Sequence, residues 1–329
     1  AYRTRSVGWL DLRPPMTRIL ITGAAGFIGA HLVAYIRTHR PDWEIVAIDR
    51  IDEAASLSRL VMHGADVKFI WHDLRAQLRP EAIGSEQLRI PFDYIAHLAA
   101  ASHVTRSVQD PLGFIADNVL GTAHVLEYAR KFTPKKLLYF STDEVFGPAP
   151  DGVSFDEYSS HAPTNPYAAS KAAAEVLCPA WASTYGVPIV VTHCTNVFGE
   201  TQHHEKFIPT CVRQIASGEV MQIHARDGVP SSRFYVHAEN VASAILTVLE
   251  RGGIIGGPAS GRYNISGDVE LSNLDVAQKV AALLGKPLKY ELVEFVPDRP
   301  RHDQRYAIKS TRLEDLGWAP HVSFEEGLR

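Results

Sequence analysis

The chain has 329 residues, enough for one large domain or two ordinary ones. Hydrophobic residues make up 46% and charged residues 21%, which is typical of a globular protein, and no run of 18 apolar residues predicts a membrane-spanning helix. The formal net charge of −4 gives no electrostatic reason to expect a nucleic acid or an anionic membrane as partner.

Cysteine and histidine usage predicts neither disulfides nor a metal site. The three cysteines, Cys178, Cys194 and Cys211, form no CxxC motif, which favours free thiols in a reducing compartment such as the cytoplasm. The fifteen histidines show no HExxH-like spacing. Their one adjacent pair, His203-His204, fits a surface or substrate loop better than a metal site.

Residues 1–15 precede Met16 and have no apolar core like that of a signal peptide. We expect them to form an extension that is peripheral to the fold. A segment that packs on a neighbouring subunit is the alternative.

The first predicted strand, residues 18–22, runs into a glycine-rich turn and then into an amphipathic helix that ends at about residue 40. In such a turn the first glycine permits tight bending, the second lets the backbone approach a pyrophosphate, and the third lets the helix pack on the strand. The residues of the turn that would contact a dinucleotide are Gly23, Gly26, Phe27, Ile28 and Gly29.

An acidic residue stands where a dinucleotide-binding fold needs one. Residues 44–48 form a second apolar strand that ends at Asp49, twenty residues after Gly29. A carboxylate at this point suits the adenosine ribose hydroxyls and favours NAD over NADP, although the adjacent Arg50 could tolerate a 2′-phosphate.

Two further strands are predicted at residues 67–72 and 94–98. Asp73 and Leu74 follow the first of them, where Asp73 could also be an ordinary turn residue. The second is followed by small residues that would allow a cofactor to approach the backbone closely. This segment is Ala99, Ala100, Ala101, Ser102 and His103.

A hydroxyl and two carboxylates follow the apolar strand predicted at residues 136–140. In open α/β sheets ligands bind at the carboxyl ends of the strands, so Thr142, Asp143 and Glu144 are candidates for chemistry. The alternative is that the two acids only cap the next helix or face solvent. Tyr167 and Lys171, four residues apart, would lie on one face of the following helix, which favours the catalytic alternative.

The C-terminal third predicts short strands and amphipathic helices. We expect a strand at residues 188–194, a loop that enters a strand at residues 226–235, and helices at residues 239–250 and 271–284. Glu205 and Lys206 could be a plain surface pair, and the arginines that follow residue 298 could be a solvated face.

In this order, the glycine turn, Asp49, the Thr-Asp-Glu triplet and Tyr-x-x-x-Lys resemble the NDP-sugar 4,6-dehydratases of the extended short-chain dehydrogenase/reductase family. The resemblance covers residues 16–329. It implies an α/β fold in which a doubly wound parallel (Rossmann) sheet binds NAD and a smaller α/β domain binds substrate. The implied division is an extension at 1–15, a NAD-binding domain at 16–193 with a returning segment at about 234–252, and a substrate domain mainly at 194–329.

The resemblance also implies a mechanism. Transient oxidation of the sugar at C4 by bound NAD makes the C5 hydrogen acidic and so permits loss of the C6 hydroxyl, and the same hydride then returns to C6. Tyr167 would take the C4 hydroxyl proton, helped by the positive charge of Lys171, because a free phenol with a pKa of about 10 is a poor acceptor at neutral pH. Thr142 would bond the C4 oxygen, Glu144 would remove the C5 proton, and a protonated Asp143 would donate to the departing hydroxyl.

Further contacts follow from the same resemblance. The implied cofactor contacts are Gly23, Gly26, Phe27, Ile28, Gly29, Asp49, Asp73, Leu74, Leu98, Ala99, Ala100, Tyr167 and Lys171. The implied substrate contacts are Ser102, His103, Thr142, Asn196, Glu205, Lys206, Arg233, Arg299 and His302. Asn118 is expected to open a helix and to steady the active-site strand. Ala101, Thr105 and Thr195 depart from the family pattern, which leaves the sugar and the nucleotide open.

The resemblance therefore implies an NDP-hexose 4,6-dehydratase. The first candidate for its substrate is dTDP-glucose, and the second candidate is UDP-glucose. A sugar-nucleotide 4-epimerase or decarboxylase is an alternative, but these relatives usually lack the acid pair. A NAD-binding regulatory protein is another, although binding alone needs none of the acids. The resemblance implies a homodimer, formed through the helices near Asn118 and Tyr167.

Overall fold

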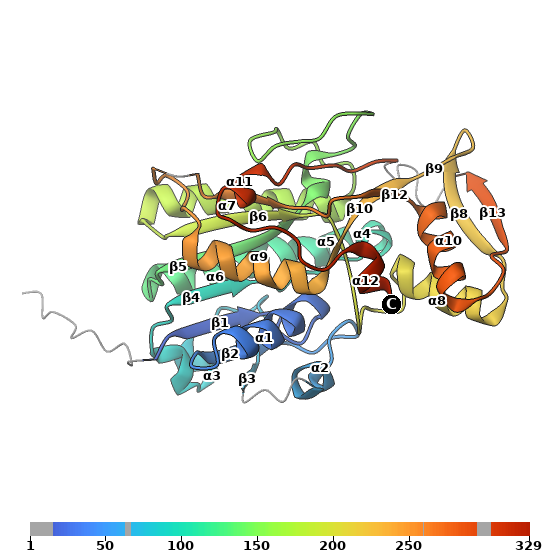
Figure 1. Ribbon diagram of the computed structural model, residues 1–329. Helices are drawn as coiled ribbons and strands as arrows, with labels where there is room; N and C mark the ends of the chain where they lie inside the picture. Colours follow the sequence, from blue (N-terminus) through green and yellow to red (C-terminus); the bar gives the residue numbers. More distant parts are fainter. Residues whose placement is uncertain (1–15, 63–66, 259, 295–303) are drawn as a thin grey trace, which may run out of the picture.

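The computed structural model describes residues 16–62, 67–258, 260–294 and 304–329. Its centre is a parallel sheet of seven strands in the order β11-β6-β5-β4-β1-β2-β3 (Figure 1). The order reverses between β1 and β4, which creates the switch point where doubly wound sheets bind ligands. The strands are β1 (Arg18–Thr22), β2 (Glu44–Asp49), β3 (Lys68–Trp71), β4 (Tyr94–His97), β5 (Lys136–Thr142), β6 (Ile189–Cys194) and β11 (Arg262–Ile265).

Side chains alternate between the two faces of this sheet, so one set of strands builds two cores. Ile19 and Ile21 pack in the core beneath α1 (Phe27–His39) and α9 (Ala238–Arg251). Leu20 packs in the opposite core, beneath α6 (Gly121–Lys131) and α7 (Pro166–Tyr185). The strands β1, β2, β4, β5 and β6 are buried on both faces, so their near-continuous apolar runs are typical of a parallel sheet, whereas the edge strand β3 is partly exposed.

Short elements connect the strands of this sheet, and those at its carboxyl edge carry many residues of the site. They are α2 (Leu57–Met62), α3 (Pro80–Ile83), η1 (Glu86–Arg89), α4 (Val104–Gln109), α5 (Pro111–Phe114), η2 (Ile115–Leu120) and η3 (Asp143–Phe146). Segment η2 is π-helical and continues directly from α5 into α6. Asn118 lies within this continuous run, so the expectation that it opens a helix was wrong.

The C-terminal part adds two small sheets, β12-β10-β7 and β13-β8-β9, beside the carboxyl edge of the large one. Their elements are β7 (Asn196–Phe198), α8 (Phe207–Ser217), β8 (Met221–Arg226), β9 (Val229–Pro230), β10 (Ser232–His237), β12 (Glu270–Ser272), α10 (Asn273–Leu284) and β13 (Tyr290–Glu294). The chain closes with α11 (Thr311–Glu314) and α12 (Phe324–Leu328). None of the helices in the described ranges is long and apolar enough to cross a membrane.

The predicted fold class is confirmed, with two local corrections. Strand β5 extends to Thr142, because Ser141 and Thr142 continue its pairing with β6, so both residues lie in the strand rather than after it. The helix expected to begin at Leu271 begins at Asn273, because Leu271 and Ser272 pair with β10 and Ser272 then caps α10. Besides α9, the segment β11 also returns to the large sheet; the domain boundaries stay a prediction.

Candidate active site

A cavity of about 660 Å³ opens at the carboxyl ends of the central strands. The elements around the switch point line it from one side, and β7, α8 and β10 from the other. It brings together most of the predicted site residues: Gly23, Gly26, Phe27, Ile28, Gly29, Asp49, Asp73, Leu74, Leu98, Ala99, Ala100, Ser102, His103, Thr142, Asp143, Glu144, Tyr167, Lys171, Asn196, Glu205 and Lys206. Arg233 is not part of the lining, and Arg299 and His302 lie outside the described residues.

The glycine turn has no room for a side chain at Gly23 or at Gly29. Gly23 adopts a φ of +71°, and a Cβ there would lie 2.7 Å from the backbone nitrogen of Ala99. A Cβ on Gly29 would collide with the carbonyl of Gly23. Helix α1 starts here without a side-chain cap at Gly26, so its first backbone N–H groups are available to an anion. The turn therefore fits a pyrophosphate.

Asp49 closes the same end of the cavity. Its carboxylate accepts hydrogen bonds from the backbone nitrogens of Ala25 (3.0 Å) and Ile51 (2.9 Å), while burial raises its pKa. The neighbouring Arg50 is bound by Asp117 at 2.6 Å and Asp52 at 3.1 Å. Because this guanidinium is already neutralised, it does not present a free cation to a 2′-phosphate, and the site fits NAD better than NADP.

Asp143 is the buried acid of the site. It is 4% exposed, and burial, followed by the charge of Glu144, raises its pKa to about 7. The Thr142 hydroxyl donates to Asp143 Oδ1 (3.2 Å). Asp143 Oδ2 has no hydrogen-bond partner within the described part of the chain. Thr142 rather than either acid caps η3, so capping does not explain the acid pair.

Glu144 is hydrogen-bonded to the N-cap residue of α7, the helix that carries Tyr167 and Lys171. Its Oε2 accepts a hydrogen bond of 2.9 Å from Asn165 Nδ2 and lies 3.5 Å from the Tyr306 hydroxyl. Asn165 is also the N-cap of α7, because its Oδ1 accepts from the backbone nitrogen of Ala168. One residue thus fixes both the acid and the helix that carries Tyr167. Sequence reasoning missed Asn165, although Asn followed by Pro166 at the first helical position is a capping signal.

Tyr167 and Lys171 are both buried on α7. Lys171 Nζ donates to the carbonyl of Phe140 (2.7 Å), and burial lowers the pKa of this ammonium to about 8. The pKa of Tyr167 is raised by burial and then by Glu144, and a hydrogen bond with Thr142 opposes this. The expected lowering of the Tyr167 pKa by Lys171 is not found: desolvation raises this pKa most, the charges of Glu144 and Asp143 add to the rise, and Lys171 is not among its main causes.

The predicted substrate side forms a set of ionic contacts across the mouth of the cavity. Glu205 binds Arg106 at 2.9 Å and lies 3.4 Å from His103, and Lys206 donates to the carbonyl of Ser102 at 3.4 Å. Glu205 and Lys206 are therefore not a plain surface pair, since each binds the segment 102–106. Sequence reasoning missed Arg106, whose partner is 99 residues away.

Arg233 is buried behind the wall of the cavity. Its guanidinium donates to the carbonyls of Ser232 (2.6 Å) and Gln304 (2.9 Å) and lies 4.7 Å from the centroid of the Tyr306 ring. Its charge lowers the pKa of Asp143, which places it near the acid pair. In β10 it is Tyr235, two residues later, that lines the cavity.

Comparisons with known proteins agree with this geometry. The NAD dependent epimerase/dehydratase family matches residues 19–266. The chain is 37% identical to the low-salt glycan biosynthesis protein Agl12 of Haloferax volcanii over 94% of this chain and 96% of that protein. The crystal structure of DesIV, a dTDP-glucose 4,6-dehydratase from Streptomyces venezuelae with NAD bound, is 33% identical, with a TM-score of 0.84 over 95% and 94% of the two chains. A UDP-glucose 4-epimerase of Thermus thermophilus in complex with NAD is 27% identical, with a TM-score of 0.83 over 95% and 97%.

Proposed function

The chain belongs to the NAD dependent epimerase/dehydratase family, and we propose that within this family it is an NDP-hexose 4,6-dehydratase that acts on dTDP-glucose. The observation that carries this proposal is the acid pair Asp143-Glu144, which shares one cavity with Tyr167 and Lys171. A dehydratase and an epimerase are both similar in backbone to this chain, so the backbone does not separate the two activities. The acids supply what elimination needs and epimerisation does not.

The cofactor is NAD, and the residues of the structure fit it. Gly23, Gly26 and Gly29 leave room for a pyrophosphate at the start of α1, and Asp49 would hold the adenosine ribose. Asp73 and Leu74 line the part of the cavity where the adenine would bind. Leu98, Ala99 and Ala100 line the part where the cofactor would pass close to the backbone. Bound NAD would supply the reversible oxidation of the sugar at C4.

The first step needs a proton acceptor for the C4 hydroxyl, and Tyr167 takes this role. Thr142, which is hydrogen-bonded to Tyr167, holds the C4 oxygen. Because burial and the charges of the two carboxylates raise the pKa of Tyr167, the positive charge of Lys171 is needed to favour its phenolate during this transfer.

Elimination then uses the two acids in different protonation states. Glu144 removes the C5 proton, and Asp143 donates a proton to the leaving C6 hydroxyl. Since the pKa of Asp143 is about 7, about half of this carboxyl is protonated near neutral pH. Burial of one carboxyl beside another is a known way to place an acid and a base side by side.

The contacts proposed for the sugar nucleotide lie on both sides of the cavity mouth. Ser102 and His103 belong to the segment after β4, whereas Asn196, Glu205 and Lys206 come from β7 and the start of α8. Arg233 is also proposed to contact the diphosphate; in the described conformation its Nη1 donates to two backbone carbonyls, and its charge lowers the pKa of Asp143. UDP-glucose remains the second candidate substrate.

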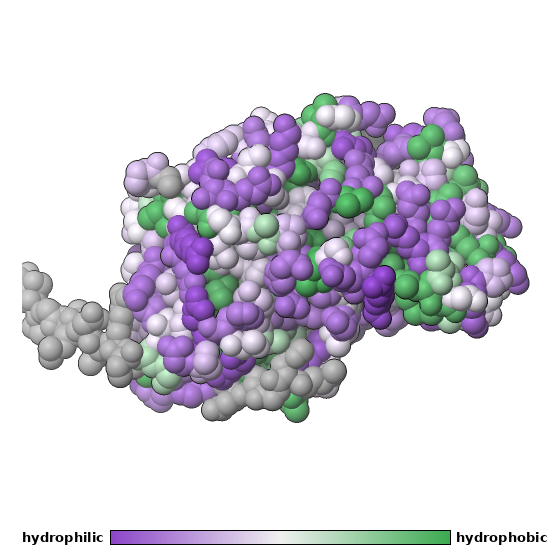
Figure 2. Space-filling view, in the orientation of Figure 1, coloured by the Kyte–Doolittle hydropathy of each residue, from purple (hydrophilic) through white to green (hydrophobic). Residues whose placement is uncertain are grey.

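A homodimer and a cytoplasmic location are also proposed. Apolar side chains are exposed on the helices that flank Asn118 and Tyr167, namely Leu112 (75%), Ile115 (50%) and Val176 (61%). On the face shown in Figure 2, hydrophobic residues form small groups separated by hydrophilic ones. Sedimentation equilibrium at micromolar concentration tests the dimer, and a monomer would rule it out. The three cysteines are free and buried, as expected in a reducing compartment.

The decisive experiment is an incubation of the purified protein with dTDP-glucose, UDP-glucose, GDP-glucose, CDP-glucose and UDP-N-acetylglucosamine, followed by mass spectrometry. Loss of one water from dTDP-glucose is expected, and loss from another donor would correct the nucleotide. An unchanged mass with a new stereoisomer would identify an epimerase. No reaction with any donor, despite bound NAD, would favour a regulatory protein.

A further inference from the structure

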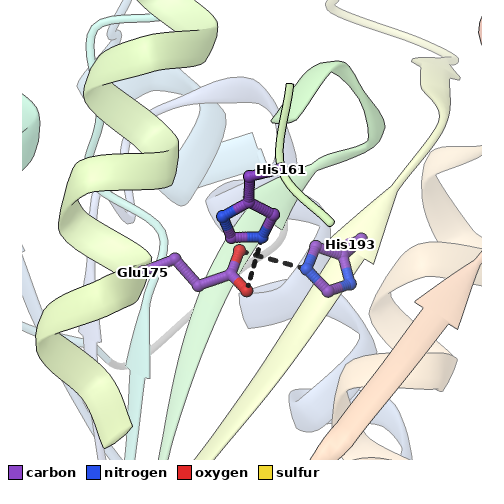
Figure 3. Close-up of side chains that lie close together, drawn as sticks. All are labelled: His161, Glu175 and His193. Carbon is purple, nitrogen blue, oxygen red and sulfur yellow. Dashed lines mark hydrogen bonds and ion pairs between the residues drawn. The ribbon is translucent and has the colours of Figure 1, made fainter. Parts of the chain in front are cut away.

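A buried ionic cluster lies next to the active site but outside the cavity lining. Its centre is Glu175 on α7, which is 1% exposed. One carboxylate oxygen accepts from Arg262 Nη1 (2.9 Å) and lies 3.2 Å from His161 Nε2, and the other lies 3.0 Å from His193 Nε2. Figure 3 shows both imidazole rings directed at the carboxylate from the loop before α7 and from β6. The mechanism above uses none of these four residues.

The cluster is connected to the reaction through α7. Tyr167, Lys171 and Glu175 follow one another at intervals of four residues, so they share one side of the helix. Lys171 makes no ion pair with any residue that the structure describes; its Nζ bonds the carbonyl of Phe140 and lies 4.4 Å from the centroid of the Tyr139 ring. A buried ammonium with only neutral contacts loses stability relative to the amine. Glu175 is the nearest source of negative charge along the helix.

We propose that Glu175 is a positioning residue for the reaction, which acts through Lys171 by supplying the buried negative charge that keeps this side chain an ammonium. Arg262 opposes this charge and so sets how much of it reaches Lys171.

The other groups around the pair do not supply this charge. The titratable groups that face Lys171 or Glu175 are His97 on β4, Tyr139 on β5, Tyr167 and Cys178 on α7, His161, His193 and Arg262. Burial raises the pKa of Tyr139, Tyr167 and Cys178 and lowers that of His97 to about 3, so these four groups are neutral at pH 7. The pKa of Glu175 lies well below its usual range because of its basic neighbours, although burial opposes this.

A metal ion is not needed to explain the cluster. The ligand atoms of His161, Glu175 and His193 lie within 4.8 Å of one another, a spacing that would suit a metal. The guanidinium of Arg262 already provides a permanent positive charge at the carboxylate, and Asn264 Oδ1 holds the second ring nitrogen of His193 at 3.0 Å. The chain itself therefore supplies a cation beside Glu175, which opposes part of its charge.

The test is a carbon NMR titration of the NAD-bound protein labelled with 13Cε-lysine, with Lys171→Arg to assign the signal. Glu175→Gln should lower the Lys171 midpoint by about one pH unit, the size expected for one charge a helical turn away. Arg262→Gln should raise it, because the opposing positive charge is removed. Two shifts in opposite directions are not expected from loosened packing.

The matched control is Glu127→Gln, which removes a carboxylate that also bonds α7, through Trp181 Nε1 at 2.9 Å, but far along the helix from Lys171. Its Lys171 midpoint should equal that of the parent. An unchanged midpoint in Glu175→Gln, or shifts of both variants in one direction, would overturn the proposal. If Glu175→Gln does not fold, Arg262→Gln decides alone, since an unchanged or lowered midpoint contradicts the proposal.

The inference rests on the proposed function for what Lys171 does, but the titration needs no turnover. If the parent dehydrates a sugar nucleotide, the alkaline limb of kcat should move with the midpoint in each variant. If the parent converts no donor while the midpoints still move, the proposed function fails and the coupling of Glu175 to Lys171 stands. If the parent dehydrates a sugar nucleotide but the Lys171 midpoints do not move, the proposed function stands and the coupling of Glu175 to Lys171 fails.

Discussion

The two ends of the cavity are built from different parts of the chain. The nucleotide end is mostly backbone: Gly23 and Gly29 leave no room for a side chain, and the start of α1 offers its N–H groups. The sugar end is made of side chains that titrate, among them Asp143 with a pKa of about 7 and Lys171 with a pKa of about 8. Backbone sites hold a ligand independently of pH, whereas the side-chain site can move protons because burial has shifted its groups toward neutrality.

The largest effect is expected at the sugar end. Glu144→Gln should lower dehydration about 10³-fold, within the range typical of a lost general base. Oxidation at C4 should survive, because Tyr167, Lys171 and Thr142 remain. We expect reduced cofactor to accumulate at 340 nm when sugar nucleotide is added, and solvent deuterium to be absent from C5. Equal loss of both half-reactions would contradict the role assigned to Glu144.

The nucleotide end is tested by adding one methyl group. Gly23→Ala puts a Cβ 2.7 Å from the Ala99 backbone at a φ of +71°, and NAD affinity should fall about 100-fold because the turn must shift away from the pyrophosphate. Gly186→Ala is the control, since Gly186 has a φ of +69° with no atom within 4 Å of the added Cβ. Calorimetry should give the control an unchanged Kd. Equal losses would mean that backbone strain, not close approach, explains the glycine.

A smaller effect is expected at Asp49, the carboxylate proposed to hold the adenosine ribose at the nucleotide end. Asp49→Ser should weaken NAD about 10-fold, the loss of one or two hydrogen bonds to ribose. Affinity for NADP should stay low, because Asp117 and Asp52 still bind Arg50. Adding Asp117→Asn should raise NADP affinity. Tight NADP binding by Asp49→Ser alone would show that Arg50 is freer than its ion pairs indicate.

Several features of the two ends of the cavity could be predicted from the sequence, because each depends on residues that are close together in the chain. The glycine turn, Asp49 and the Tyr-x-x-x-Lys pair each lie within one strand-helix unit, where three to twenty residues fix the geometry. The boundary at Leu271 could not be predicted, since its apolar pattern suits helix and strand alike. Pairing of Leu271 with Arg233 of β10 decides it, and that partner is 38 residues away.

The ionic contacts of the acids were also hard to predict, because their partners are distant in the sequence. Arg106 meets Glu205 and Arg262 meets Glu175 across 99 and 87 residues. Such pairs depend on how separate elements pack, and an isolated Arg or Glu in a sequence is usually a solvated charge. The predicted protonation of Asp143 agrees with the rise of its pKa on burial. The pKa of Tyr167 is raised by burial and by the charges of Glu144 and Asp143, which the pattern of Tyr167 and Lys171 alone did not predict.

The last prediction concerns what the buried acid costs the fold. The pKa of Asp143 rises from 3.8 to about 7 on folding, so the folded state binds this proton more tightly than the unfolded chain. Its contribution to stability is fully present below about pH 4 and is lost as the pH rises through 7. Asp143→Asn cannot ionise, so at pH 8 the variant should be more stable than the parent by on the order of 4 kcal/mol, with little difference at pH 4.

Melting temperatures of the parent and Asp143→Asn between pH 4 and pH 8 measure this effect, and the gain should amount to a few degrees at pH 8. Asp227→Asn makes the same change at an exposed aspartate and should track the parent at every pH. The more stable variant should also be the slower enzyme, because an asparagine has no proton to give to the C6 hydroxyl. A constant difference between Asp143→Asn and the parent across this range would mean that the carboxyl is solvated after all, and that the sugar end is no more sensitive to pH than the nucleotide end.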